Sequence, residues 1–466
     1  MRFSLLFIAS VLLTVSAHAH PTFNASLEQL QTAQTNTHIL NFKLKQGASV
    51  PHLKESILKA SGNSVMILPV FRHWQKDLLT HPLALYYYAY YAHELSVSEA
   101  TDILHRLSSA EGVEYAYFEP YYKDAGFSEV EPLPVVEQDP LEPIPNLESE
   151  QYYLKAAPDG MGAFAAWKLP GGTGKGLRVL DIETGWFTDH VEFAPTFYDN
   201  NKNQFRDHGT AVWGEIAAKR DGVGTTGIAY EADFAIAGHG VTGDFRVFPK
   251  VLATVIEESV LRLSAGDVMI LPMQVSAVNN LSVPVEYFPE VFEAVKATVQ
   301  KGIFCIAAAG NSEMDLDHPR YDGAFDLRVR DSGCIIVGAT ESPMHVPPRV
   351  KADYSNFGSR VDVAGFGRDL TTTGFGNRYN ARTAEGKLAS YTSFFNGTSA
   401  AVPLVAGAVV STLGILKAKG IQVTPLQMRE ALRATGTPQT GDTTKRIGNL
   451  PEIKQLVQYL TLSKGE

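Results

Sequence analysis

The feature that most constrains the fold of this chain is the alternation of short apolar runs with longer helix-like segments between residues 177 and 416. The strand-like runs are 177–184, 232–238, 267–274, 303–311 and 334–340, and the helix-like segments are 208–220, 247–266, 290–302 and a long one after Ser399. Strands joined by helical crossovers lie parallel, and helices cover both faces of such a sheet. The alternation predicts an α/β domain, a mostly parallel sheet sandwiched by helices, with its function at the carboxyl ends of the strands.

A change of composition separates this part from the residues before it. Residues 126–150 hold five prolines and many acids, so this stretch is predicted to be an exposed interdomain linker. Before it, 37–47 and 112–120 have the pattern of strands, and 50–61 and 96–110 have the pattern of helices. We therefore predict a small α+β domain over residues 20–125 and the α/β domain over 151–466.

The first 19 residues have the layout of a secretory signal peptide. They carry Arg2, an apolar run over 5–15, and small residues at Ala17 and Ala19 before a cleavage site at His20. A membrane anchor, the alternative, would want about 20 apolar residues. The other long apolar run, 400–416, contains Pro403 and suits a buried core helix. We expect a secreted protein, extracellular or periplasmic, with no membrane contact in the mature form.

The net charge and the cysteine content bear on the partners of the protein and on its disulfide bonds. The net charge of −10 and the lack of any Lys/Arg-rich run argue against a nucleic-acid partner. The two cysteines, Cys305 and Cys334, are too few for a disulfide framework and lie in apolar, strand-like runs. In an exported protein they are either one bridge or two buried thiols.

Two carboxylates stand out on the first predicted strand of the α/β domain. Asp181 and Glu183 lie two residues apart in VLDIETGW, so both point to the same face. Acids are seldom buried without a partner that compensates their lost hydration. The pair therefore predicts a functional site at the end of this strand.

Three loops carry polar residues suited to catalysis. Asp207–Gly214 places His208 where a helix begins, Ala309–Ser312 ends an apolar strand at Asn311, and Phe395–Pro403 places Ser399 at the mouth of a helix, behind a glycine. Each residue alone is more readily interpreted as a cap or a turn. An acid, a histidine, an asparagine and a serine in this order supply every role that acyl transfer needs.

In these motifs the chain resembles the subtilisin-like serine peptidases, the subtilases, from about Gly174 to Gly448. The resemblance lies in HGTAVWGEIAAKRDGVGTTGIA, AAAGNS and NGTSAAVPLVAGA. It implies a subtilisin-like fold, with Ser399 as nucleophile, His208 as general base and Asn311 as oxyanion donor. It also implies that residues 20–125 are a propeptide that assists folding and covers the cleft as an intramolecular inhibitor.

The chain departs from the family pattern at two places. Where the family has a Ser-Leu-Gly-type segment on one wall of its specificity pocket, this chain has Leu271-Pro-Met-Gln274, and proline donates no hydrogen bond to a β ladder. Where the family has Asp-Ser/Thr-Gly, this chain has Glu183-Thr-Gly. We predict Glu183 as the acid that orients His208, and Asp181 as a supporting or alternative acid.

The family resemblance also raises the question of a metal. Glu192 and Asp221 fall where the resemblance implies calcium ligands, and a solvated polar turn is the alternative for both. The predicted chemistry needs no cofactor, so calcium would be structural.

The sequence thus predicts a secreted serine endopeptidase, a monomer that hydrolyses polypeptides through an acyl-enzyme. The alternative is a catalytically impaired subtilase that serves as a binding or chaperone module. A lipase or esterase of the α/β-hydrolase kind would have Gly-x-Ser-x-Gly and its histidine last. In this chain His208 precedes Ser399, and the serine has different neighbours.

Overall fold

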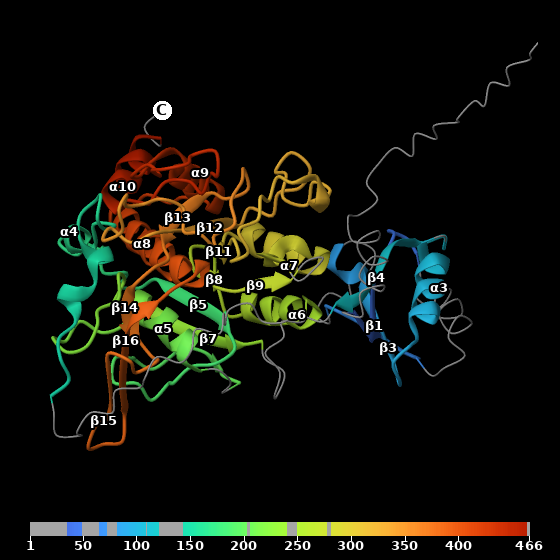
Figure 1. Cartoon of the computed structure of the whole chain (residues 1–466), viewed down its shortest axis with the longest axis horizontal. Coiled ribbons are helices and arrows are strands. Elements are labelled where there is room, and N and C mark those ends of the chain that lie inside the picture. Colours follow the sequence, from blue (N-terminus) through green and yellow to red (C-terminus); the bar gives the residue numbers. More distant parts are fainter. Residues whose placement is uncertain are drawn as a thin grey trace, which may run out of the picture.

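The computed structural model describes residues 35–48, 65–71, 82–108, 110–120, 143–202, 206–239, 249–276 and 281–463. The predicted signal peptide, the predicted helix 50–61 and most of the predicted linker lie outside the described residues. Two bodies stand side by side along the long axis of the molecule, a small one formed by residues before 121 and a large one formed by residues after 142 (Figure 1).

The small body is an antiparallel sheet with one described α-helix on a face. Its strands are β1 (Thr35–Leu44), β2 (Val65–Pro69), β3 (Tyr86–Tyr91) and β4 (Val113–Pro120), in the order β2-β3-β1-β4, with η2 (Pro82–Leu85) before β3. Helix α3 (Val97–Ser108) begins directly after Ser96. Ser96 N–H donates to Glu99 Oε2 at 2.8 Å, and Glu99 N–H donates to Ser96 Oγ at 3.3 Å, which completes a capping box.

The tyrosines of β3 alternate between two environments, as side chains on a strand must. Tyr87 and Tyr91 pack with α3 in the core of the small body, whereas Tyr86 packs with residues of the large body. Lys250 Nζ lies 4.4 Å from the centre of the Tyr88 ring, and the rings of Tyr117 and Phe288 stack at 6.1 Å. The tyrosines of β3 thus pack against the large body through one of the two faces of the strand.

The large body is built on a parallel sheet, which confirms the predicted fold class. Its order is β13-β12-β11-β8-β5-β7-β6. The strands are β5 (Arg178–Glu183), β6 (Asp199–Asn200), β7 (Asp233–Gly238), β8 (Val268–Leu271), β11 (Phe304–Ala308), β12 (Ile335–Thr340) and β13 (Val363–Phe366). Strand β5 lies between β7 and β8, where the direction of the strand order reverses, so its carboxyl end borders the crevice at which ligands bind in such sheets.

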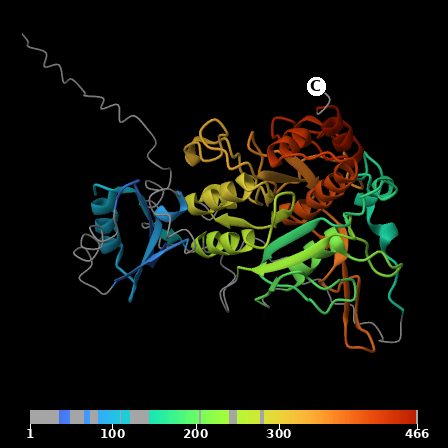
Figure 2. The same ribbon diagram turned by 180° about the vertical axis from the view of Figure 1, so that it is seen from behind.

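Helices cover both faces of this sheet (Figures 1 and 2). Helices α5 (Arg206–Ala217) and α8 (Thr398–Ala418) lie on one face, and α6 (Pro249–Val260) and α7 (Pro289–Gln300) lie on the other, between the sheet and the small body. Along β5, Val179 packs on the α8 side and Leu180 on the α6 side. Because faces alternate, Asp181 and Glu183 point to the side of α5 and α8.

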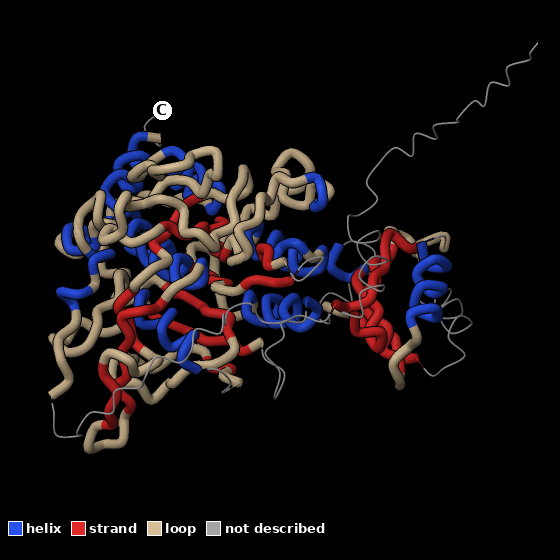
Figure 3. The backbone as a smooth tube through the Cα atoms, viewed as in Figure 1, coloured by secondary structure: helices blue, strands red, loops and turns tan. Residues whose placement is uncertain are grey.

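Smaller elements complete the large body (Figure 3). Two hairpin-like sheets are formed by β9 (Gln274–Ser276) with β10 (Ser282–Pro284), and by β14 (Leu370–Thr373), β16 (Leu388–Phe395) and β15 (Tyr379–Arg382). The remaining helices are α4 (Ala163–Ala166), α9 (Pro425–Ala434) and α10 (Ile453–Leu462), with single turns η3 (Glu148–Glu150), η4 (Tyr152–Leu154), η6 (Val285–Tyr287) and η7 (Pro319–Tyr321).

Helix α8 forms the centre of the core. In the described part of the chain it is the one helix long and apolar enough to cross a membrane, but it is wholly buried inside the fold. This agrees with the predicted core helix. Cys305, on β11, and Cys334, which directly precedes the neighbouring strand β12, are free thiols, and Cys334 Sγ donates to Cys305 O at 3.4 Å.

Candidate active site

The end of β5 meets the first turn of α5 through a short contact between Glu183 and His208. The distance from Glu183 Oε1 to His208 Nδ1 is 2.5 Å, and both side chains are almost wholly buried. The other carboxylate oxygen, Oε2, accepts the Thr184 N–H at 3.1 Å. A carboxylate held in this way fixes the tautomer of the imidazole, because Nδ1 must carry the proton that it donates. Nε2 then carries the lone pair and can act as a base.

The contact between Glu183 and His208 requires α5 to approach the end of β5 closely. A Cβ on Gly209 would lie 2.4 Å from Gly185 O and 2.7 Å from Trp186 Nε1. Any larger residue would push α5 away from the end of β5. The glycine after His208 thus lets the imidazole reach Glu183.

Asp181 has a different partner. Its Oδ2 accepts a 2.9 Å hydrogen bond from Trp186 Nε1, and its side chain is fully buried. Burial, and then the nearby charge of Glu183, raise the pKa of Asp181 well above its usual value, and the indole bond only partly opposes this. A protonated Asp181 avoids placing two negative charges on one face of β5. The acid that contacts His208 is Glu183.

Ser399 and Asn311 converge on one point in front of Gly397. A Cβ on Gly397 would lie 3.0 Å from Ser399 Oγ, 3.5 Å from Asn311 Nδ2 and 3.7 Å from the backbone nitrogen of Ser399. Gly397 has a φ of 110°, a conformation that favours glycine. The glycine therefore leaves open a space bordered by a hydroxyl and two N–H donors, the arrangement needed to hold a developing oxyanion.

The amide of Asn311 is oriented by its carbonyl end. Asn311 Oδ1 accepts from Thr398 N at 2.9 Å and from Thr398 Oγ1 at 2.8 Å. Since these donors fix the oxygen, the NH₂ group must face the other way, toward Ser399. The Asn311 backbone N–H in turn donates to Gln274 Oε1 at 2.6 Å.

One buried asparagine anchors the loop that carries Asn311. Asn356 Nδ2 donates to Ser282 O at 2.6 Å and to Ala309 O at 2.8 Å, and Asn356 Oδ1 accepts from Ser312 N and Met314 N. Sequence reasoning missed this residue, because a lone asparagine in a loop carries no recognisable signal.

A second histidine beside the acid was also missed. His239 follows β7, its N–H donates to Glu183 O at 3.0 Å, and its side chain is buried. Burial lowers the pKa of His239 to about 4, against the opposing effect of the Glu183 charge. His239 is therefore neutral at pH 7. His239 directly follows a predicted strand, and this position in the sequence could have indicated that it lies near the acid.

The two calcium candidates lie near each other beyond the C-terminal end of α5, where the Lys219 N–H donates to Glu192 O at 3.1 Å. Glu192 is buried and its Oε1 accepts from the Tyr391 hydroxyl at 2.6 Å, while Asp221 Oδ1 accepts from Val223 N at 3.3 Å. In the described ranges no three His, Cys, Asp or Glu side chains converge as metal ligands. Calcium takes about 6 to 8 oxygens, so backbone carbonyls would have to supply most of them. Calcium binding stays a prediction.

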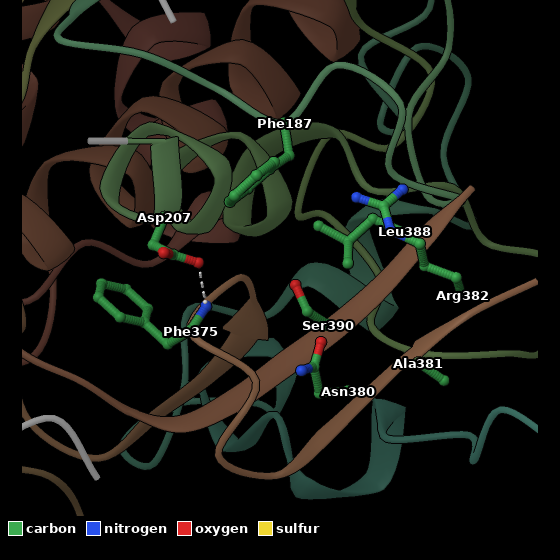
Figure 4. Close-up of a pocket in the computed structure, with 8 residues that line it drawn as sticks. All are labelled: Phe187, Asp207, Phe375, Asn380, Ala381, Arg382, Leu388 and Ser390. Atoms are coloured by element: carbon green, nitrogen blue, oxygen red, sulfur yellow. Dashed lines mark hydrogen bonds between the residues drawn. The ribbon is translucent and has the colours of Figure 1, made fainter. Parts of the chain in front are cut away.

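A cavity of about 440 Å³ borders the first turn of α5. Figure 4 shows its lining, in which Asp207, the residue before His208, accepts a 2.7 Å hydrogen bond from Phe375 N. Phe187 lies across the opening from the β15–β16 hairpin (Figure 4). The described lining includes Asp207 but not His208, Asn311 or Ser399, so the cavity adjoins the start of α5 and is separate from the point that Ser399 borders.

Comparisons with known proteins identify the family and the fold. The subtilase family profile matches residues 111–449. The chain is 27% identical to subtilisin-like protease 6 of Trichophyton soudanense over 60% of this chain and 64% of that protein. It is 27% identical to alkaline elastase YaB of Bacillus sp. over 68% of this chain and 74% of that protein. The match thus spans slightly less than two thirds of the Trichophyton protein.

A solved structure shares the fold. Fervidolysin from Fervidobacterium pennivorans, described as a keratinolytic enzyme related to subtilisin, matches with a TM-score of 0.61 and 18% identity, over 91% of this chain and 61% of that one. At this identity the likeness speaks for the fold alone. The subtilase family profile matches most of the length of this chain, and the chain therefore belongs to the subtilase family.

Proposed function

We propose that this chain is a secreted serine endopeptidase that hydrolyses peptide bonds through an acyl-enzyme on Ser399. The observation that carries the proposal is the convergence of Ser399 Oγ, Asn311 Nδ2 and the Ser399 N–H on one open point. A nucleophile and two donors around the same point suit a carbonyl group under attack. The contact between His208 and Glu183 supplies the base.

The proposed reaction has two halves. Ser399 Oγ attacks the substrate carbonyl carbon as its proton passes to His208 Nε2, and Glu183 stabilises the imidazolium through Nδ1–H. The oxyanion is held by Asn311 Nδ2 and the Ser399 N–H at the N-terminus of α8, where the helix dipole adds to the stabilisation. His208 then gives its proton to the departing amine. Water, activated by His208, hydrolyses the ester. These side chains supply every proton transfer.

The small body has a proposed role as propeptide, that is, as intramolecular inhibitor and folding aid. It packs on α6 and α7 through Tyr86 and Tyr117, and the Tyr117 hydroxyl donates to the Glu290 carboxylate. This buried aromatic contact covers apolar surface of the two helices. Residues 1–19, as a signal peptide, would direct the chain to secretion, and the mature enzyme would act as a monomer on polypeptides.

A fluorophosphonate probe tests the catalytic proposal. The probe labels a serine only when a working base activates it, so the wild-type chain should be labelled at Ser399 and Ser399→Ala should not. Peptide mapping identifies the labelled residue, and circular dichroism establishes that both proteins are folded. A folded wild-type protein that takes no label and cleaves no peptide would support the impaired binding module instead.

A further inference from the structure

Ser399 and Asn311, the proposed nucleophile and oxyanion donor, lie on two separate segments of the chain. Ser399 is in the first turn of α8, behind Gly397, and Asn311 is in the loop after β11. Groups that act on one reacting atom must be held within about 0.5 Å of their productive geometry. A third segment, residues 354–357, bonds to both of these segments. We call it the bridging segment.

The backbone of the bridging segment pairs with the loop that carries Asn311. Asn356 N donates to Gly310 O at 2.9 Å, and Glu313 N donates to Tyr354 O at 2.8 Å. Gly310 precedes Asn311 and Glu313 follows it by two residues, so these bonds hold the loop on both sides of the oxyanion donor. Tyr354 is thereby fixed through its own main chain to the position of this loop.

The side chain of Asn356 reinforces the pairing. It is fully buried, and its Oδ1 accepts from Ser312 N at 3.1 Å and from Met314 N at 2.8 Å. Its Nδ2 donates to Ala309 O at 2.8 Å. A buried amide that satisfies several backbone groups in this way makes both segments rigid. The bridging segment and the loop of Asn311 therefore form one unit.

The side chain of Tyr354 reaches the segment of the nucleophile. Its hydroxyl donates to Gly367 O and accepts from Gly397 N, at an N–O distance of 3.1 Å. Gly397 N also donates to Gly367 O at 3.0 Å, so the three groups form a closed cluster. A Cβ on Gly367 would lie 2.7 Å from the hydroxyl oxygen of Tyr354. The glycine thus leaves room for the hydroxyl against the backbone of the turn that carries Ser399.

The ring of Tyr354 is held in place between these contacts. The guanidinium carbon of Arg368 lies 4.9 Å from the centre of the ring, and Arg368 Nη2 pairs with Glu341 Oε1 at 3.1 Å. Burial raises the pKa of the Tyr354 hydroxyl above its usual range. The hydroxyl therefore keeps its proton at neutral pH and donates it to Gly367 O.

We propose that Tyr354 is a positioning residue of the oxyanion site, which holds Gly397 and Ser399 at the separation from Asn311 that lets both donors reach one oxygen. This inference rests on the proposed function and adds a residue to its machinery. The Tyr354 hydroxyl acts through Gly397 and not on the substrate. Its loss should weaken the stabilisation of the transition state and leave the binding of the peptide in its ground state unchanged.

Tyr354→Phe tests this role, because it removes the hydroxyl and keeps the ring. The bond from Gly397 N to Gly367 O remains and keeps the turn folded. We expect kcat to fall roughly three- to tenfold, the factor that one net hydrogen bond supplies, while KM stays the same. Both constants are measured on one quenched fluorescent peptide after circular dichroism has verified folding. A wild-type kcat in Tyr354→Phe, or a change confined to KM, would overturn the inference.

Tyr321→Phe is the matched control. The Tyr321 hydroxyl is also buried, and among the described residues it has no hydrogen-bond partner. The same chemical change at this position should therefore leave kcat and KM unchanged. An equal fall of kcat in Tyr321→Phe and Tyr354→Phe would overturn the inference, because the loss would then follow from removing any buried hydroxyl.

A double-mutant cycle with Asn311→Ala separates positioning from a general loss of stability. Asn311→Ala alone should lower kcat by about 10² to 10³-fold, which is measurable at a higher enzyme concentration. Without the Asn311 amide its alignment with Ser399 has no effect, so adding Tyr354→Phe should change kcat by less than about twofold. A further fall as large as that in the wild-type background would overturn the inference.

The same measurements distinguish this inference from the peptidase proposal. An active wild-type enzyme whose kcat is insensitive to Tyr354→Phe would remove the inference alone. A folded wild-type protein that neither cleaves the peptide nor takes the fluorophosphonate label at Ser399 would remove the peptidase proposal, and the inference with it.

Discussion

Trp186 Nε1 donates to Asp181 Oδ2 at 2.9 Å, so the first acid along β5 binds an indole while the second, Glu183, contacts His208. The two carboxylates share one face of a strand but have separate partners. Their substitution by amides should therefore have different consequences for catalysis.

Glu183→Gln should lower kcat/KM by several powers of ten, toward the roughly 10⁴-fold loss known for an amide at the acid position of such a triad. The amide no longer fixes the tautomer of His208 or stabilises its positive charge. Asp181→Asn should cost much less, because a protonated Asp181 already resembles an amide in charge. Both variants are measured on one chromogenic peptide after folding is verified. A larger loss at Asp181 than at Glu183 would show that the assignment of the acid is wrong.

Gly397→Ala should abolish turnover in a protein that still folds. Its methyl group would occupy the open point 3.0 Å from Ser399 Oγ, where the substrate carbonyl must sit. Gly420→Ala is the matched control, because Gly420 also has a positive φ but nothing lies within 4 Å of an added Cβ. The control should lose about 1 kcal/mol of stability and keep its activity. Similar activity losses in both variants would mean that backbone strain, not occupation of the site, is the cause.

Stability should fall on mild acidification because of His239. Its pKa is about 4 in the folded protein and about 6.5 when exposed, so the unfolded chain binds more protons between these values. The contribution of His239 to the free energy of unfolding should be full above pH 6.5 and should decline as the pH falls toward 4. This contribution is on the order of 3 kcal/mol. Chemical denaturation in a Ser399→Ala background avoids self-digestion.

His239→Gln provides the comparison for this pH dependence. Glutamine fills a similar space and does not titrate in the range, so the curve of unfolding free energy against pH should be flatter between 6.5 and 4. Burial also lowers the pKa of His190 to about 4. His190 should therefore maintain part of the pH dependence of the unfolding free energy in the variant. Parallel curves for the two proteins would rule out a contribution from His239.

Self-processing should separate the two bodies of the chain. Exposed connecting segments are preferred sites of cleavage, so we expect the active enzyme to cut between about Asp124 and Glu150. Wild-type protein should yield a catalytic fragment beginning in that stretch, and Ser399→Ala should remain whole. N-terminal sequencing of the fragment locates the cut. The same fragment from both proteins would assign the cleavage to another protease.

Sequence periodicity was sufficient to predict the parallel sheet and its helices, because apolar runs such as 303–311 must be buried on both faces of a sheet. Periodicity was insufficient to predict the sheet of β14, β15 and β16. Polar and apolar residues do not alternate regularly in these strands, and pairing between distant segments determines their structure. Likewise, the sequence motifs pointed to Glu183 and His208, which are in contact, and to Asn311 and Ser399, which border one point. The supporting contacts of Gln274 and Asn356 depend on distances between loops, which no local pattern encodes.

Ser399 stands at the start of a helix that is itself the centre of the hydrophobic core. The proposed nucleophile therefore belongs to a buried unit of the fold, which is expected to be its most stable part, and not to a loop that opens locally. Heat or denaturant should remove activity and tertiary structure in a single step, without a folded but inactive intermediate. An enzyme of this architecture loses its catalytic serine only when it loses its core.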